Sequence, residues 1–274
     1  MPVAPEGSAG APQGGRTPVG YRAAVATGME AAAFPPVVRA ETARLAEVIA
    51  TADPDRAVPT CPGWDLRRLA RHVGGVHRWA TAVVRTGEPV DPGSLPRDAP
   101  RDAAGLATWL REGAEVFCAA AGDGPLDRPC WAWGPDRRVR FWARRLAHET
   151  LVHRLDAELA AGASPAVVEP AVAVDAIDEL FENAAAIPHL AGVRGDGEMI
   201  HLHATDTDGE WLLHLGPGGW DVRAEHGRGD VAVRGPAEAL LLVVLGRLPA
   251  TTSPAVEIFG DAAVLERFTG AFRF

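Results

Sequence analysis

The sequence predicts an α plus α+β protein, an up-down helical bundle followed by a small α+β domain, and two observations carry this prediction. Up to residue 187, apolar residues recur at helical spacing in five segments. From residue 192 onward, the pattern changes to short runs with period-two alternation, separated by Gly, Pro and Asp turns. A helical region followed by a strand-rich one is typical of separate helical and α+β domains.

The N-terminal stretch, residues 1–33, is rich in Gly, Pro and Ala with little periodicity, so we expect a mostly disordered tail. The bundle is then expected over residues 34–193. In its second helix, Asp65 stands where an N-cap is needed, directly before the apolar stripe that begins at Leu66. The five predicted helices span residues 36–52, 66–87, 104–121, 139–161 and 172–187.

The α+β domain is expected over residues 194–274. Its alternating runs are residues 199–206, 210–216, 220–226 and 230–235, and two helical patterns follow at 236–248 and 261–272. In the first run, His201 and His203 alternate and therefore share one face of a strand. They line a binding cleft or lie on a solvated sheet face, and the pattern does not decide between the two.

Charge and composition limit the classes of function. A net charge of −9 and a pI of about 5.5 argue against a nucleic-acid binder, which usually carries a basic face. The sequence contains no apolar run long enough for a membrane span and no secretory-signal pattern, so a cytoplasmic location is expected. The chain has no lysine, which excludes Schiff-base and P-loop lysine chemistry. Its three cysteines form no disulfide framework.

The stretch RFWARRLAHETLVHRLDAE, residues 140–158, resembles a zinc-protease helix but has the wrong spacing. The protease motif places two His residues four apart, whereas His148 and His153 are five apart. On a helix, five residues correspond to a rotation of about 140°, so this pair does not face one ion. Glu149 and His153 are four apart and share a face. They form a ligand pair that needs a third member.

The third ligand is expected from the helix at 66–87, where His72 and His77 both lie beside the apolar stripe. A set of His72, Glu149 and His153 leaves a fourth position open, as in catalytic zinc sites. Asp156, three residues after His153, is placed to orient an imidazole. The alternative is a hydrogen-bonded core histidine and a Glu149 that pairs only with Arg145.

Two segments, VPTCPGWDLRRLARHVGGVHRW at 58–79 and FWARRLAHETLVHRLDAE at 141–158, resemble the signatures of the mycothiol-dependent maleylpyruvate isomerase family. This family is part of the DinB-like metal-binding bundles. The segments HLHATDTDGEW, VRGPAEALLLVVLGR and EIFGDAAVLERF resemble its sterol-carrier-like C-terminal domain. The resemblance covers roughly residues 34–270 and implies a divalent metal, with zinc as the first choice, on His72, Glu149 and His153.

The resemblance further implies a small electrophilic substrate and mycothiol as thiol cosubstrate, with no nucleic-acid or membrane partner. The metal would activate the thiol for addition to a cis double bond, and the reaction would be a cis-trans isomerisation. Because the chain has no lysine, Arg side chains are expected to hold the substrate carboxylates, with Arg247 first and Arg234 second. Two alternatives stay open: a mycothiol S-transferase of detoxification or secondary metabolism, and a non-catalytic metal-binding module.

Overall fold

The computed structural model describes residues 20–22, 29–163 and 166–272. The chain forms two compact units. One comprises Glu30–Ala166, and the other comprises the described residues up to Met29 together with those from Val167 onward. Among the described residues, no helix combines the length and the apolar composition needed to cross a bilayer.

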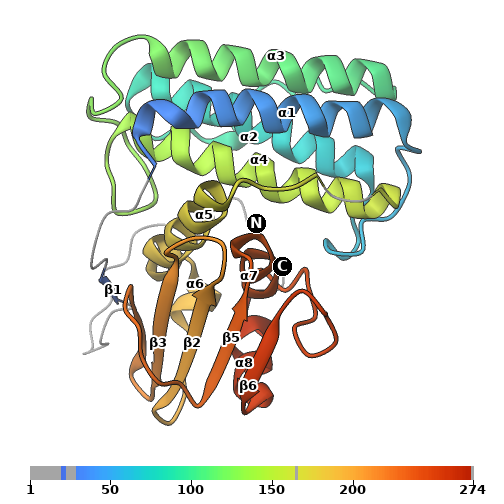
Figure 1. Ribbon diagram of the computed structural model, residues 1–274. Coiled ribbons are helices and arrows are strands. Elements are labelled where there is room, and N and C mark those ends of the chain that lie inside the picture. Colours follow the sequence, from blue (N-terminus) through green and yellow to red (C-terminus); the bar gives the residue numbers. More distant parts are fainter. Residues whose placement is uncertain (1–19, 23–28, 164–165, 273–274) are drawn as a thin grey trace. The chain divides into compact units, whose positions relative to one another are not determined.

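The first unit is a bundle of four helices, which are four of the five that the helical periodicity predicts (Figure 1). Helix α1 packs against α3 and α4, and α2 packs against the same two helices, so the four helices close a ring around one core. Leu45, Leu66 and Leu110 are fully buried in this core. The helices are α1 (Phe34–Thr51), α2 (Leu66–Thr86), α3 (Ala103–Gly122) and α4 (Val139–Ala161).

Local sequence signals set the ends and the packing of α2. The Asp65 side chain accepts a hydrogen bond from the backbone N–H of Arg68, which confirms Asp65 as the N-cap. Gly87 ends the helix with a φ of 73°, a conformation that glycine adopts without steric cost. At Gly74, a Cβ atom would collide with the Trp109 ring of α3. The close approach of α2 and α3 therefore depends on a glycine at this position.

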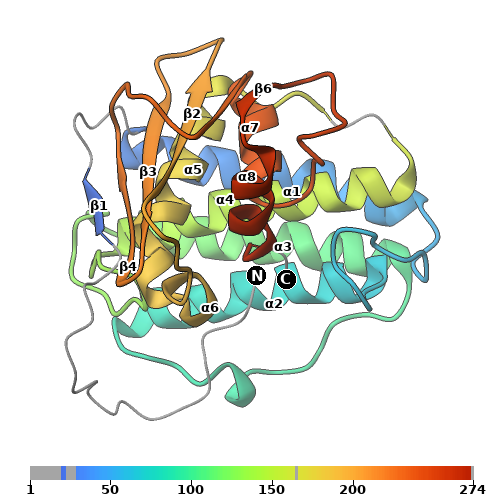
Figure 2. The same ribbon diagram turned by 90° about the horizontal axis from the view of Figure 1, so that it is seen from below.

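The second unit is built on a six-stranded mixed sheet with the order β1-β4-β3-β2-β5-β6. Figure 1 labels β5 and Figure 2 labels β4. The β4-β3-β2 meander is antiparallel, β5 pairs parallel with β2, and β6 pairs antiparallel with β5. The strands are β1 (Gly20–Arg22), β2 (Glu198–Ala204), β3 (Glu210–Gly216), β4 (Gly219–Arg223), β5 (Val231–Gly235) and β6 (Glu257–Gly260). The helices are α5 (Pro170–Asn183), α6 (Pro188–Ala191), α7 (Ala237–Val244) and α8 (Ala262–Gly270).

One face of this sheet forms the core of the unit. Ile200, Leu202, Trp211 and Trp220 lie on it and are buried. The Trp211 indole N–H donates to Asp178 of α5 at 2.7 Å, and Trp220 packs edge-on against a phenylalanine of α8. The opposite face, which we call the outer face, carries the polar side chains of His203, Glu210 and Arg234 on β2, β3 and β5, together with the apolar Leu212 of β3.

The structure differs from the predicted domain boundaries in two places. Helix α5 packs on α7 and belongs to the sheet unit, so the division falls at residue 166 rather than 193. The stretch predicted to be disordered contains β1, which pairs with β4, and a short 3-10 helix at Ala31–Ala33. The rest of that predicted tail, residues 1–19 and 23–28, lies outside the described residues.

Candidate metal centre

Three side chains meet inside the bundle at a single carboxylate oxygen. His72 of α2 places its Nε2 atom 2.9 Å from Glu149 Oε1. His153, one turn along α4 from Glu149, places its Nε2 atom 3.3 Å from the same oxygen. All three ligand atoms lie within 4.8 Å of one another. The structure thus brings together the three residues that the sequence predicts as ligands.

The charges at this site depend on its burial. Burial lowers the pKa of His72, which keeps its imidazole neutral. Burial opposes the ionisation of Glu149, but contacts with His153 and His72 and the charge of Arg145 outweigh it and hold the pKa well below its usual value. Burial also opposes the charging of His153, but Asp156, Cys61 and Glu149 raise its pKa to about 10. With this pKa, His153 carries a proton at neutral pH, and a divalent cation has to displace that proton before Nε2 can bind it. An ionised carboxylate and two neutral imidazoles are then a suitable donor set for the cation.

The surroundings of His153 Nε2 test whether a metal ion fits among the three residues. This atom is buried, and its 3.3 Å contact with Glu149 Oε1 lacks hydrogen-bond geometry, so no described residue satisfies it with a hydrogen bond. A buried polar atom without a partner is costly. Because this atom faces Glu149 Oε1 and lies beside His72, a cation bound by the three residues would satisfy it. The residues present therefore fit a metal ion.

Neighbouring groups hold two of the three ligands in place. Arg145 donates to Glu149 Oε2 at 2.8 Å, so Oε1 is left to face the histidines. Asp156 Oδ2 lies 3.0 Å from His153 Nδ1, which agrees with the role expected from its i, i+3 spacing. Cys61 donates a long hydrogen bond to the same Asp156 oxygen at 3.4 Å. The predicted Arg145–Glu149 pair thus exists together with the ligand cluster, not in place of it.

We expect the Asp156→Asn substitution to weaken metal binding by about 10- to 100-fold, since partners that orient a metal-bound histidine typically contribute this much. The reason is that Asn presents either its oxygen or its NH₂ group to His153 Nδ1 and lacks the carboxylate charge. Competition with a chromophoric chelator measures the dissociation constant. An unchanged constant would contradict the orienting role of Asp156.

Trp64 and Arg68 lie beside the cluster, and the sequence reasoning did not identify either as a site residue. The Trp64 ring meets His72 edge-on at 4.9 Å and stacks on His153 at 6.0 Å between centroids. The Arg68 guanidinium lies 5.0 Å from the Trp64 ring centroid. Arg68 is four residues before His72 and shares its helix face. The bundle therefore supplies both an apolar wall and an exposed cation next to the ligands.

The other two histidines of this region lie apart from the cluster. His148 packs edge-on against Phe34 of α1, with ring centroids 5.9 Å apart. His77 is fully buried, and its Nε2 atom lies 2.9 Å from the Thr150 hydroxyl of α4. Of the two predicted candidates on α2, His72 therefore lies beside Glu149 and His77 does not.

His77 should make the protein less stable as the pH falls. Burial lowers its pKa to about 4, whereas an unfolded histidine titrates near 6.5. Between these two values the unfolded state binds a proton that the folded state does not, so stability is lost as pH falls from about 6.5 towards 4. Between pH 7 and pH 5, this one group should cost roughly 2 kcal/mol. Urea unfolding of the wild type and His77→Gln at both pH values measures it, and equal pH dependence in the two proteins would contradict this assignment.

The two predicted carboxylate-binding arginines lie in the sheet unit. Arg247 follows α7, is 9% exposed and donates to the backbone oxygen of Leu245 at 2.8 Å. Arg234 lies on the outer face of β5, where its exposed side chain is 3.8 Å from Glu257. Their role towards a substrate stays a prediction.

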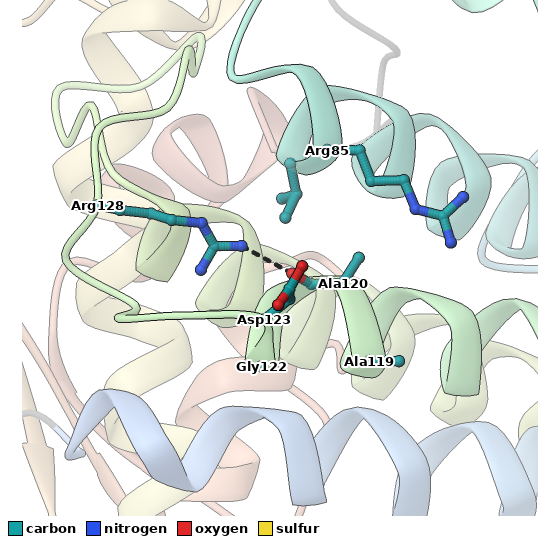
Figure 3. A pocket seen from close by; sticks show the side chains of 7 residues that line it. Arg85, Ala119, Ala120, Gly122, Asp123 and Arg128 are labelled. Atoms are coloured by element: carbon teal, nitrogen blue, oxygen red, sulfur yellow. Dashed lines mark hydrogen bonds between the residues drawn. The ribbon is translucent and has the colours of Figure 1, made fainter.

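A pocket on the bundle surface lies away from this chemistry. Its lining includes Arg85 near the end of α2 and Arg128 after α3 (Figure 3). There the Arg128 guanidinium donates hydrogen bonds to the backbone oxygens of Ala120 and Ala121. Residue 84, which also lines it, is about 18 Å along α2 from His72 at 1.5 Å per residue. We therefore assign no catalytic role to this pocket.

Two of the solved structures that match this chain share its fold. The crystal structure of a mycothiol-dependent maleylpyruvate isomerase matches with a TM-score of 0.57 and 14% identity, over 84% of this chain and 93% of that one. A histidine-to-alanine variant of a mycothiol-dependent maleylpyruvate isomerase matches with a TM-score of 0.56 and 13% identity over the same shares. A search of curated protein sequences found no match.

Two family models match consecutive parts of the sequence. The mycothiol maleylpyruvate isomerase N-terminal domain matches residues 37–158, which contain all three residues of the cluster. The C-terminal domain of the same family matches residues 171–267. Together the two models cover most of the chain and both of its compact units. The chain belongs to the mycothiol-dependent maleylpyruvate isomerase family, a family of enzymes.

Proposed function

We propose that this protein is a metal- and mycothiol-dependent cis-trans isomerase of the maleylpyruvate type. The observation that carries the proposal is the convergence of His72 Nε2 and His153 Nε2 on Glu149 Oε1, where the buried His153 Nε2 makes no contact of hydrogen-bond geometry with a described residue. Family membership and the names of the solved relatives support the thiol and the reaction class. A cytoplasmic location is part of the same proposal.

The residues of the cluster have distinct parts in this proposal. His72, Glu149 and His153 would hold one divalent ion, with zinc as the first choice for a His₂Glu set. When bound, such an ion supplies a deprotonated thiol at neutral pH. Three protein ligands leave one coordination position for that thiol. Arg145 and Asp156 keep Glu149 and His153 oriented, and the Trp64 ring excludes water from their side.

The proposed reaction needs no net proton transfer. Addition of the thiolate to one carbon of the cis double bond forms a C–S bond and moves the π electrons onto the conjugated carbonyl. Rotation about the resulting single bond follows. Elimination breaks the C–S bond, restores the double bond in the trans geometry and returns the thiolate. For maleylpyruvate, the product is fumarylpyruvate.

A dicarboxylate substrate requires cations, and three arginines are candidates for binding it. Arg247 and Arg234 follow from the sequence, and Arg68 is added because it lies one turn from His72. Loss of a buried charge-assisted contact typically costs on the order of 2–5 kcal/mol. Replacement of the arginine that binds the substrate by Ala should therefore lower kcat/KM by tens- to thousands-fold with unchanged metal content.

The three Arg→Ala variants are compared by steady-state kinetics, and the metal content of each variant is measured as well. Arg67→Ala is the matched control, because Arg67 neighbours Arg68 on α2 but pairs with Asp55 at 2.8 Å. Near-normal efficiency in both Arg247→Ala and Arg234→Ala would contradict substrate binding by the C-terminal unit. A loss confined to Arg68→Ala would assign the substrate carboxylates to the bundle.

An activity screen tests the function itself. The metal-loaded protein is incubated with mycothiol and either maleylpyruvate or a panel of epoxides, halides and activated sugars. We expect thiol-dependent formation of fumarylpyruvate. Thiol consumption with an electrophile of the panel, and none with maleylpyruvate, would favour the S-transferase alternative. Bound metal with no reaction at all would favour the non-catalytic metal-binding module.

A further inference from the structure

A second cluster of ligand side chains lies on the outer face of the sheet, within the C-terminal unit. His201 Nε2, His203 Nδ1 and His226 Nδ1 lie 2.8, 2.9 and 2.6 Å from one oxygen, Oε1 of Glu210. The four ligand atoms all lie within 4.8 Å of one another. None of these residues takes part in the function proposed above.

The sheet itself determines the positions of three of the four residues. His201 and His203 alternate on β2 and therefore point to the same face. Glu210 begins β3 and pairs directly with His203 in the antiparallel register. Directly paired residues have Cβ atoms about 5 Å apart. The β2–β3 hairpin thus places two imidazoles and a carboxylate close together on one face of the sheet.

The fourth residue comes from the loop after β4, residues 224–230. This loop lies against the outer face, since a Cβ atom at Gly227 would collide with Leu212 and one at Gly229 would touch the backbone of β2. The loop carries His226 to Glu210, although the His226 side chain itself is 79% exposed. His201, beneath the loop, is 8% exposed.

We propose that His201, His203, Glu210 and His226 form a second, structural metal site for a divalent ion of the zinc class. Three imidazoles and one carboxylate are donors that zinc accepts, and four protein ligands complete a tetrahedral shell. No position is left for substrate, in contrast to the three-ligand cluster of the bundle. The ion fastens the 224–230 loop to the β2–β3 hairpin.

The distances fit such a shell with small adjustments. With bonds of about 2.0–2.1 Å, neighbouring ligand atoms of a tetrahedral zinc site lie about 3.3 Å apart. The three nitrogen–oxygen distances, 2.6 to 2.9 Å, need to open by about 0.4 to 0.7 Å to reach this spacing. His226 is on a loop and His203 is 39% exposed, so both side chains have room for this change.

The protonation states favour the same assignment. Burial lowers the pKa of His201 and so keeps its imidazole neutral. Burial opposes the ionisation of Glu210, but the three histidines outweigh it and lower its pKa. A neutral imidazole and an ionised carboxylate are the forms in which these groups bind metals.

Metal stoichiometry of the full-length protein tests the proposal. The purified chain is stripped with a chelator, reloaded with Zn²⁺, dialysed against metal-free buffer and measured by mass spectrometry. We expect two ions per chain in the wild type and one in His226→Ala. Because His226 is exposed, its replacement should leave the fold intact. His214→Ala, which removes an exposed histidine of β3 outside the cluster, should keep both ions.

This experiment reports on the two metal sites independently, so its result for the second site does not depend on the proposed function. His153→Ala should retain the ion of the second site, and the double variant with His226→Ala should retain none. A wild type with a single ion that persists in His226→Ala would overturn the proposal. A single ion that is lost in His226→Ala would support the second site and contradict the first.

Limited proteolysis tests the structural role. Arg228 lies exposed in the loop and is a trypsin site. We expect Zn²⁺ to slow cleavage after Arg228 at least several-fold in the wild type and to have no effect in His226→Ala. Equal cleavage rates with and without Zn²⁺ in the wild type would show that no ion fastens the loop.

Discussion

His153→Ala is expected to remove most of the metal bound in the bundle and, with it, thiol-dependent activity. His153 supplies one of only three protein ligands, so its loss leaves His72 and Glu149 to hold an ion that needs a chelate. The variant also removes the histidine that Asp156 orients. Metal content by mass spectrometry, measured in a His226→Ala background so that the second cluster does not contribute, gives the result directly.

His148→Ala is the matched control for this experiment. His148 lies on the same helix five residues earlier, is equally buried and packs against Phe34 rather than towards His72. Metal content should be unchanged in this variant. Equal metal loss in both variants would mean that the substitutions act through the fold of α4, and the ligand assignment would be wrong.

Arg154→Leu is expected to destabilise the bundle by about 3–5 kcal/mol, the usual cost of removing one partner of a buried ion pair. Arg154 is fully buried in α4 and donates to Glu41 of α1 at 2.7 Å and to Glu158 at 2.6 Å. Both carboxylates have side chains at most 10% exposed. Without the guanidinium they repel each other in a place that water barely reaches. Urea denaturation measures the change.

Two further variants separate this charge effect from simple loss of packing. Arg39→Leu breaks the exposed pair with Glu115 and should cost less than about 1 kcal/mol. Adding Glu41→Gln and Glu158→Gln to Arg154→Leu should restore part of the stability, because the buried charges are then gone. If the triple variant is no more stable than Arg154→Leu alone, the interpretation as an uncompensated charge fails.

Most of the bundle and part of its site were predictable because the signals are local. Apolar periodicity located the four helices, and the Asp65 cap located the start of α2. The four-residue spacing of Glu149 and His153 fixed their common face before any tertiary structure was known. The choice between His72 and His77 was not local. These two residues are about 140° apart around α2, and only the packing of α2 on α4 shows that His72 meets Glu149 while His77 meets Thr150.

Non-local pairings explain what the sequence did not reveal. Strand β1 joins the sheet beside β4, about 200 residues later in the chain, and no short-range pattern predicts such a pairing. The alternation of His201 and His203 was visible, but their partner His226 comes from a loop after another strand. Trp64 was hidden for a similar reason, since a loop folds its ring onto His72 of α2 and His153 of α4 at once.

Anomalous diffraction at the zinc absorption edge, from crystals of the zinc-loaded protein, is the most direct test of the central claim. We expect a strong peak within about 2.0–2.2 Å of His72 Nε2, Glu149 Oε1 and His153 Nε2. The peak should be absent in His153→Ala crystals and present in His148→Ala crystals. A zinc-loaded wild-type crystal without a peak among these three side chains would contradict the metal centre and, with it, the thiol chemistry proposed for this protein.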